Sequence, residues 1–280
     1  MKKHWSTIIL IVILFIGLSL LLYPTVSDYW NSFRQSRVIS NYLEKVAEID
    51  DAEYNRIWDS ATEYNKKLAK RGNVWDLSDK ALAEYNSQLD ILGNGIMGYI
   101  DIPVIDCSLP IYHGTSEAVL QTAIGHVEGS SLPVGGSGSH CVLSGHRGLP
   151  SARLFTDLDK MVVGDIFTLR TLDTVMTYEV DRILIVLPHE LDPLKIIRGK
   201  DLCTLVTCTP YGVNTHRLLV TAHRIDNIEE ETDVRVTADA MQIETTIIAP
   251  IIAVPILLLL LMWILVNTRS RKKRRRKPNV

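Results

Sequence analysis

Cysteine is scarce in this sequence, which contains four: Cys107, Cys141, Cys203 and Cys208. A chain of this length can bury an adequate core without covalent staples, so its composition argues against a disulfide scaffold. Cys203 and Cys208 are five residues apart, which in a β-strand puts them on opposite faces, on the order of 16 Å apart. That pair cannot form a disulfide without breaking the strand. The absence of any C-x2-C pair also disfavours a zinc site, so we predict neither a metal nor a cofactor. A Cys107–Cys141 bridge remains open.

Charged residues are absent from two long apolar runs, Ile8–Leu22 and Ile247–Val266. With its flanks, each is close to the ~20 residues that span a bilayer. Lysines precede the first run and the string RSRKKRRRK follows the second, so the positive-inside rule predicts two cytoplasmic ends and an extracellular middle. The first run lacks a small-residue cleavage pattern, which favours a retained anchor over a cleaved secretory signal. We therefore expect a multi-pass protein of the cell membrane.

An apolar run followed by a basic tail is also found at the end of proteins that become covalently attached to the cell wall. The segment VTADAMQIETT before the second run contains no Leu-Pro-X-Thr-Gly signal, so the chain does not resemble such a protein. All 32 acidic residues, but only 20 of the 30 basic ones, lie between the two runs, giving the extracellular segment a net charge of about −12. This acidity argues against nucleic acid as a partner. The basic tail beside a membrane span is explained by attraction to anionic lipid.

Between the runs the pattern changes from helical to β-rich. Apolar residues recur at three- and four-residue spacing up to about residue 92, with a stop at Gly72 and a further helix from Asp79 to Leu92 capped by Ser78. After Gly95, short β-rich runs alternate with turns, which predicts a closed barrel or a sandwich. The predicted parts are a cytoplasmic N-terminus (1–6), a transmembrane helix (7–23), an extracellular helical arm (24–92), a β-domain (93–230), a juxtamembrane linker (231–246), a second transmembrane helix (247–266) and a basic cytoplasmic tail (267–280).

Cys208 is the candidate nucleophile, because it lies at the end of a predicted strand, beside a loop that contains Pro210 and Gly212. A hairpin-like return of the chain would bring Arg217 level with it, where a guanidinium favours a thiolate or stabilises an oxyanion. A nucleophilic cysteine also needs a base. His146 follows the end of another apolar strand and is the best-placed candidate, with His126 as a weaker rival and a structural histidine as the alternative.

The segments around Cys208, His146 and Arg217 resemble those of a known enzyme family. TLVTC at 204–208 matches the Thr-Leu-X-Thr-Cys signature of sortases, the membrane-bound cysteine transpeptidases of Gram-positive bacteria. The strings GHVEGSSLPVGG, SGHRGLPSARLFTDLDKMVVGD and TLVTCTPYGVNTHRLLV resemble the class C, pilus-assembling branch. The similarity runs from about Gly93 to Ile225. It implies a mainly β fold, a sortase-type closed barrel of about eight strands with an N-terminal helical arm, flanked here by two transmembrane helices.

The resemblance implies that Cys208 is the nucleophile, His146 the general acid and base, and Arg217 the group that stabilises developing charge. In this family the thiolate attacks the Thr–Gly bond of a Leu-Pro-X-Thr-Gly-like signal, and class C enzymes pass the acyl group to a lysine amine of another pilin. The implied partners are pilin subunits with sorting signals and acceptor lysines. Alternatives are a housekeeping-type enzyme that transfers proteins to a peptidoglycan precursor, and an inactive scaffold that only binds pilin tails.

One motif departs from the family pattern. Class C members usually cover the site with a lid in which Asp-Pro precedes an aromatic residue. The corresponding loop here, at about 71–78, has Asn73, Val74 and Trp75. An ion pair from position 73 to Arg217 is therefore not available, and Trp75 is expected to cover the site by apolar contact, with Asp76 as a substitute acid. The alternative is that this segment is an ordinary loop between helices.

Overall fold

The computed structural model describes residues 5–227 and residue 255, and the chain divides into two compact units. One unit contains Met1–Tyr29 and Thr232–Val280, and the other contains Trp30–Glu231. Apart from residue 255, the predicted linker, second span and basic tail (231–280) lie outside the described residues.

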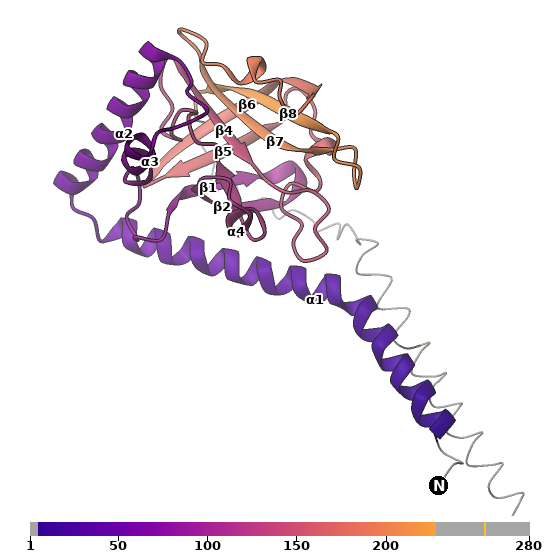
Figure 1. The fold of residues 1–280 in the computed structure, drawn as a ribbon. Coiled ribbons are helices and arrows are strands. Elements are labelled where there is room, and N and C mark those ends of the chain that lie inside the picture. The colour runs from indigo at the N-terminus through magenta and orange to yellow at the C-terminus, as the bar shows by residue number, and fades with distance from the viewer. Residues whose placement is uncertain (1–4, 228–254, 256–280) are drawn as a thin grey trace, which may run out of the picture. The chain divides into compact units, whose positions relative to one another are not determined.

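Helix α1 (Trp5–Ala47) contains the first predicted span. Among the described residues it is the one helix long and apolar enough to cross a membrane, with a mean hydropathy of 2.6 and no buried residue in its most apolar window. The helix continues through Pro24, so the predicted boundary between span and arm at residue 24 is not a helix end. Figure 1 shows α1 as a single long helix.

Helices α2 (Asp51–Arg71) and α3 (Asp79–Asn86) form the rest of the arm. As predicted, α2 ends at Gly72, which has a φ of 82°, a conformation that suits glycine because it has no Cβ. The predicted cap of α3 is also confirmed, since the Ser78 hydroxyl accepts a hydrogen bond from the backbone N–H of Ala81 at 3.4 Å.

The prediction that α3 extends to Leu92 is wrong, because the chain turns after Asn86. Leu89 has a positive φ of 59°. The Asp90 carboxylate then accepts hydrogen bonds from the backbone N–H groups of Asn94 and Gly95, at 3.0 and 2.9 Å. A local side-chain acceptor thus competes with helical hydrogen bonding, as Asp commonly does at turns.

Eight strands form a closed barrel in the order β1-β2-β3-β4-β7-β8-β6-β5, which confirms the predicted mainly β fold with a closed barrel of about eight strands. The β2–β3 and β4–β7 pairs are parallel, and the other pairs are antiparallel. The strands are β1 (Ile96–Ile102), β2 (Cys107–His113), β3 (Ile124–His126), β4 (Ser139–Ser144), β5 (Ile166–Thr171), β6 (Thr174–Val186), β7 (Asp201–Thr209) and β8 (His216–Ile225). A one-turn helix, α4 (Glu117–Leu120), lies between β2 and β3.

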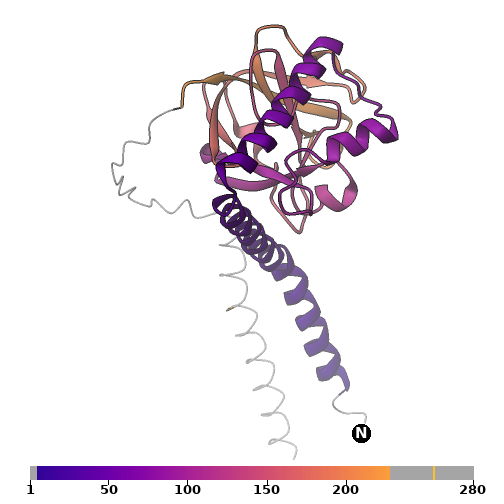
Figure 2. The ribbon, with the colours of Figure 1, turned by 90° about the vertical axis from the view of Figure 1, so that its left-hand side faces the viewer.

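Alternate residues of each strand fill the barrel interior, among them Ile100, Leu143, Phe167, Leu205 and Val220. Helices α2 and α3 lie together on one side of the barrel (Figures 1 and 2), where Leu68 and Tyr85 pack against Met97 of β1. The C-terminal part of α1 is held by Tyr42, whose hydroxyl donates to the Met97 carbonyl and accepts from the Leu172 backbone N–H. The helical arm is therefore packed on the barrel wall.

Candidate active site

Cys208 and Arg217 are directly opposite each other in the antiparallel pair β7–β8, as the sequence spacing predicts. Opposed residues of such a pair project their side chains on the same face of the sheet. That face is the outer one, because the alternating residues Cys203 and Leu205 belong to the barrel core. Cys208 is half-buried and lies one residue before the end of its strand.

The other three cysteines are free thiols in different surroundings. Cys141 and Cys203 oppose each other across the parallel pair β4–β7, and both are buried. Cys107 lies at the start of β2, where its sulfur is 3.9 Å from the carbonyl oxygen of Leu154. Burial raises the pKa of the Cys107 thiol to about 12. Cys208 is therefore the thiol in the surroundings best suited to nucleophilic chemistry.

His146 reaches the same level of the barrel from the other side of β7. In the parallel pair β4–β7, Ser144 is opposite Val206. The next residue extends this contact, because the Gly145 N–H donates to the Val206 carbonyl at 3.0 Å and the Gly145 carbonyl accepts from the Thr207 hydroxyl at 2.8 Å. One further step along each chain brings His146 level with Cys208. The order across the sheet is then His146, Cys208, Arg217.

The ring of His146 is 28% exposed, and its Nε2 lies 3.7 Å from a Glu117 carboxylate oxygen. This separation is longer than a hydrogen bond, and Nε2 has no hydrogen-bond partner within the described part of the chain. Glu117 is in α4, near the end of β4 because β3 runs antiparallel to β4. A histidine nitrogen without a partner is available to accept or donate a proton.

His126, the weaker rival, is held in a buried structural network. Its Nδ1 is 2.9 Å from the Tyr85 hydroxyl and its Nε2 is 2.8 Å from the Ser131 carbonyl. Both ring nitrogens are therefore occupied, and the contact ties α3 to the barrel. His140 is likewise buried, between the Lys195 carbonyl and the Thr204 hydroxyl, and this burial lowers its pKa.

The Arg217 guanidinium is held by backbone oxygens of its own loop. Its Nη1 donates to the carbonyls of Asn214 and His216, at 3.2 and 3.1 Å. Among residues 5–227 it has no carboxylate within ion-pairing distance. A guanidinium has five N–H donors, so others remain to bind an anionic oxygen on the face shared with Cys208.

The face that carries Cys208 also carries an apolar surface, here called the outer apolar cluster. Its buried members are Val142, Leu194, Val206 and Leu219, and its half-buried members are Trp75, Val127, Leu184, Val186 and Leu191. Val206 is two residues from Cys208 on the same strand, about 7 Å along it. Trp75 therefore packs on the same outer face of the barrel as the candidate nucleophile.

The other two predicted lid residues lie differently. Asn73 anchors the loop, because its Nδ2 donates to the Gly129 carbonyl at 3.2 Å and its Oδ1 accepts from the Ile196 N–H at 2.9 Å. Asp76 is exposed, and it forms no ion pair with Arg217. The structure thus brings Trp75 onto the face of Cys208, while Asn73 holds the loop to the barrel wall.

Gly129 and Glu117 were missed by sequence reasoning. A Cβ on Gly129, whose φ is +83°, would lie 1.9 Å from the carbonyl oxygen of Val74, so the loop that carries Trp75 sits directly on this glycine. Glu117 lies 29 positions before His146 and carries no motif. Neither residue has a sequence signal, because both contacts join segments that are distant along the chain.

The Sortase domain family matches residues 100–225 of this chain. Sortase A of Streptococcus agalactiae serotype III (strain NEM316) is 25% identical over 227 residues, which are 78% of this chain and 83% of that protein. Sortase D of Bacillus subtilis (strain 168) is 30% identical over 115 residues, which are 41% of this chain and 55% of that protein.

Solved structures extend the similarity. The crystal structure of sortase C1 from Streptococcus agalactiae is 55% identical with a TM-score of 0.68, and the match covers 69% of this chain and all of that one. Sortase C of Streptococcus pneumoniae is 42% identical with a TM-score of 0.60, over 68% of this chain and 97% of that one. Clostridium perfringens sortase C, solved with the C-terminal cell wall sorting motif, is 41% identical with a TM-score of 0.60, over 69% of this chain and all of that one.

Proposed function

Because the chain belongs to the sortase family of cysteine transpeptidases, we propose that it cleaves a Leu-Pro-X-Thr-Gly-like sorting signal between Thr and Gly and joins the Thr carbonyl to a lysine amine of another pilin. The class C branch predicted from the sequence is confirmed by sortase C structures at up to 55% identity. In this proposal Cys208 is the nucleophile, His146 the general acid and base, and Arg217 the group that stabilises the oxyanion.

The observation that carries the proposal is the register of three neighbouring segments, β8, β7 and the end of β4. Cys208 is opposite Arg217 on β8, and the register of β4 leads to His146 on the other side. A thiol between a proton carrier and a fixed cation has the partners that acyl transfer requires. An inactive scaffold would not need this arrangement.

The reaction follows from these positions. The Cys208 thiolate attacks the Thr carbonyl carbon, and the oxygen becomes an oxyanion that the free N–H groups of Arg217 stabilise. As the tetrahedral intermediate collapses, His146 donates a proton to the departing glycine amine, leaving a thioester on Cys208. An incoming lysine amine then attacks the thioester and gives its proton to His146. The thiolate leaves, and the product is an isopeptide bond.

The position of Trp75 supports the proposal that its loop covers this site. It packs into the outer apolar cluster on the face of Cys208, and Asn73 holds the loop through Gly129 and Ile196. A sorting peptide that reaches Cys208 along this face would have to displace the indole. In this proposal the lid closes by apolar contact and loop anchoring, without an ion pair to Arg217.

The long apolar helix supports a membrane anchor. The apolar window of α1 has no buried residue, as expected for a segment that faces lipid. With the basic residues at both ends of the sequence, the proposed topology has two spans and an extracellular catalytic domain. In this topology the pilin substrates are met at the outer face of the membrane.

Trapping the acyl-enzyme tests the proposal. The full chain in detergent is incubated with a peptide bearing a Leu-Pro-X-Thr-Gly sequence, and mass spectrometry locates the adduct. The expected species is a thioester between the Thr carbonyl and Cys208, which a pilin lysine resolves into an isopeptide. Cleavage at another bond, or an adduct on another residue, would overturn the assignment. Transfer only to a peptidoglycan-type amine would favour the housekeeping alternative.

A further inference from the structure

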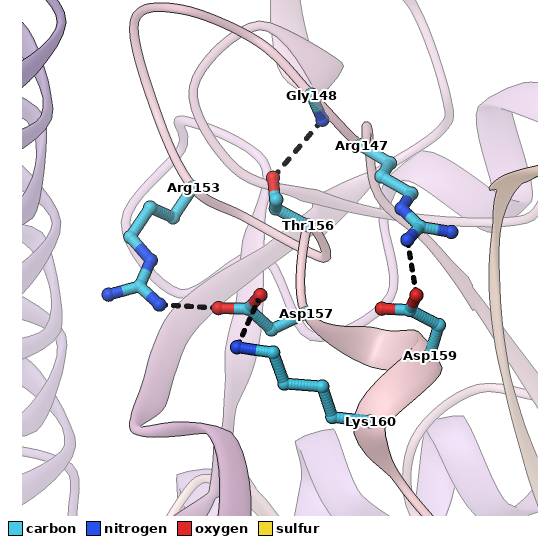
Figure 3. A network of polar contacts seen from close by, with 7 residues as sticks. All are labelled: Arg147, Gly148, Arg153, Thr156, Asp157, Asp159 and Lys160. Atoms are coloured by element: carbon cyan, nitrogen blue, oxygen red, sulfur yellow. Dashed lines mark hydrogen bonds and ion pairs between the residues drawn. The ribbon is translucent and has the colours of Figure 1, made fainter. Parts of the chain in front are cut away.

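Arg147 follows His146 in the sequence, and its side chain is only 11% exposed. The guanidinium forms an ion pair with Asp159 (Figure 3) and lies over the ring of Tyr211, 5.7 Å from the ring centroid. An arginine held between a carboxylate and an aromatic face has a defined orientation. Its position is therefore set by two contacts from different parts of the chain.

Tyr211 belongs to the loop that follows the nucleophile, three residues after Cys208. The same ring packs against the backbone beside Arg147, since a Cβ on Gly148 would lie 2.8 Å from a ring carbon of Tyr211. Yet Tyr211 as a whole residue is 61% exposed. The ring thus lies over the loop of His146 without contributing to a buried core.

The remainder of the His146 loop is pinned by its own contacts. The His146 carbonyl accepts from the Phe155 N–H at 3.1 Å, and the Gly148 N–H donates to the Thr156 hydroxyl at 3.1 Å. Figure 3 shows that Asp157, which pairs with Arg153 and Lys160, lies apart from the Arg147–Asp159 pair. Arg147 is the member of this network that also contacts Tyr211.

We propose that Arg147 and Tyr211 form a clamp that holds His146 at its working distance from Cys208. This inference rests on the proposed function. Both are positioning residues, since neither needs to touch the reacting atoms. The β4–β7 register ends at Ser144 and Val206, so His146 lies in the loop beyond β4, while Cys208 is near the end of β7. The clamp joins the His146 loop to the loop that follows β7. A displacement of about 1 Å between reacting groups can cost on the order of 10²-fold in rate.

The test compares Tyr211→Ala with Tyr211→Phe, which keeps the ring. Lys160→Ala is the matched control, because it removes an ion pair from the same loop that does not reach Tyr211. For each full-length variant, the maximum rate of thioester formation on Cys208 and the half-saturating peptide concentration are measured, together with the thermal unfolding midpoint. Arg147→Lys, which keeps the charge but loses the planar group, is the second variant.

For Tyr211→Ala we expect a ~10- to 100-fold lower maximum rate at an unchanged half-saturating concentration and unfolding midpoint. Tyr211→Phe and Lys160→Ala should match the parent, and Arg147→Lys should be slowed. A parental maximum rate in Tyr211→Ala would overturn the clamp. So would a change confined to the half-saturating concentration, which would make Tyr211 a peptide-binding residue. A parent chain that forms no thioester would instead refute the proposed function.

Discussion

Cys208 and Arg217 face each other across the β7–β8 pair, nine residues apart in the chain. The loop between them places the proposed nucleophile and a guanidinium on one face of the barrel wall. Both backbones are held by ladder hydrogen bonds, so the spacing of the two side chains varies little. A fixed cation beside a reacting carbonyl stabilises charge without reorganisation during the reaction.

Cys208→Ala should abolish both thioester formation and polymerisation while the fold persists. The other three cysteines are buried or lie elsewhere on the barrel, so none can supply the covalent step. The measurements are adduct mass, isopeptide-linked product and the thermal unfolding midpoint. Substantial transpeptidation by this variant would remove Cys208 from the mechanism.

Arg217→Lys should lower kcat/KM by roughly 10²- to 10³-fold, as loss of an oxyanion donor typically does. A lysine keeps the charge but offers a point ammonium in place of a planar fork. It also cannot reproduce the two bonds to the Asn214 and His216 carbonyls while still presenting donors to substrate. Near-parental kinetics would show that Arg217 serves only packing or general charge.

Iodoacetamide near pH 7.5 should modify Cys208 alone in the folded chain. Cys141 and Cys203 are buried, and the Cys107 thiol, with its pKa raised to about 12, holds almost no thiolate until far higher pH. Mass spectrometry should find one modified cysteine in the folded protein and four after denaturation. Modification of Cys107 at neutral pH would contradict its raised pKa.

Trp75→Ala should speed this labelling of Cys208 by about tenfold. Without the indole, the closed state of the loop loses roughly 1.5 kcal/mol of apolar burial, so the loop opens more often. The rate should depend weakly on salt in parent and variant alike, since Arg217 has no carboxylate partner among the described residues to be screened. Labelling rates at low and high ionic strength test both points. Equal rates in parent and variant would mean that this loop is not the lid.

Gly129→Ala should open the lid without altering Trp75. The new methyl group would meet the Val74 carbonyl at 1.9 Å and push the loop outward, and labelling of Cys208 should accelerate as in Trp75→Ala. Gly164→Ala is the matched control, because Gly164 also has a positive φ but no atom within 4 Å of the added Cβ. Both variants carry backbone strain of about 1–2 kcal/mol. If Cys208 is labelled equally fast in the Gly129→Ala and Gly164→Ala variants, backbone strain alone explains the faster labelling.

Features that depend on near neighbours in the chain could be predicted from the sequence. Hydrophobic runs located α1 and the strands, and a single glycine or serine marked the end of α2 and the start of α3. Strand alternation separated Cys203 from Cys208, and the short return loop placed Arg217 opposite Cys208. In each case the hydrophobic repeat or the capping contact involves residues only a few positions apart, so it can be recognised from the sequence.

The tertiary structure alone decided which distant segments meet. The loop of His146 reaches the end of β7 because β4 pairs in parallel with β7, and Gly145 contacts Thr207, 62 residues further along the chain. Trp75 lies on the face of Cys208 because the loop at 72–78 packs on Gly129 and is hydrogen-bonded to Ile196 through Asn73. Arg147 meets Tyr211 in the same way. These residues meet only when the long segments between them fold around a shared core. A local sequence pattern does not predict which distant segments become neighbours.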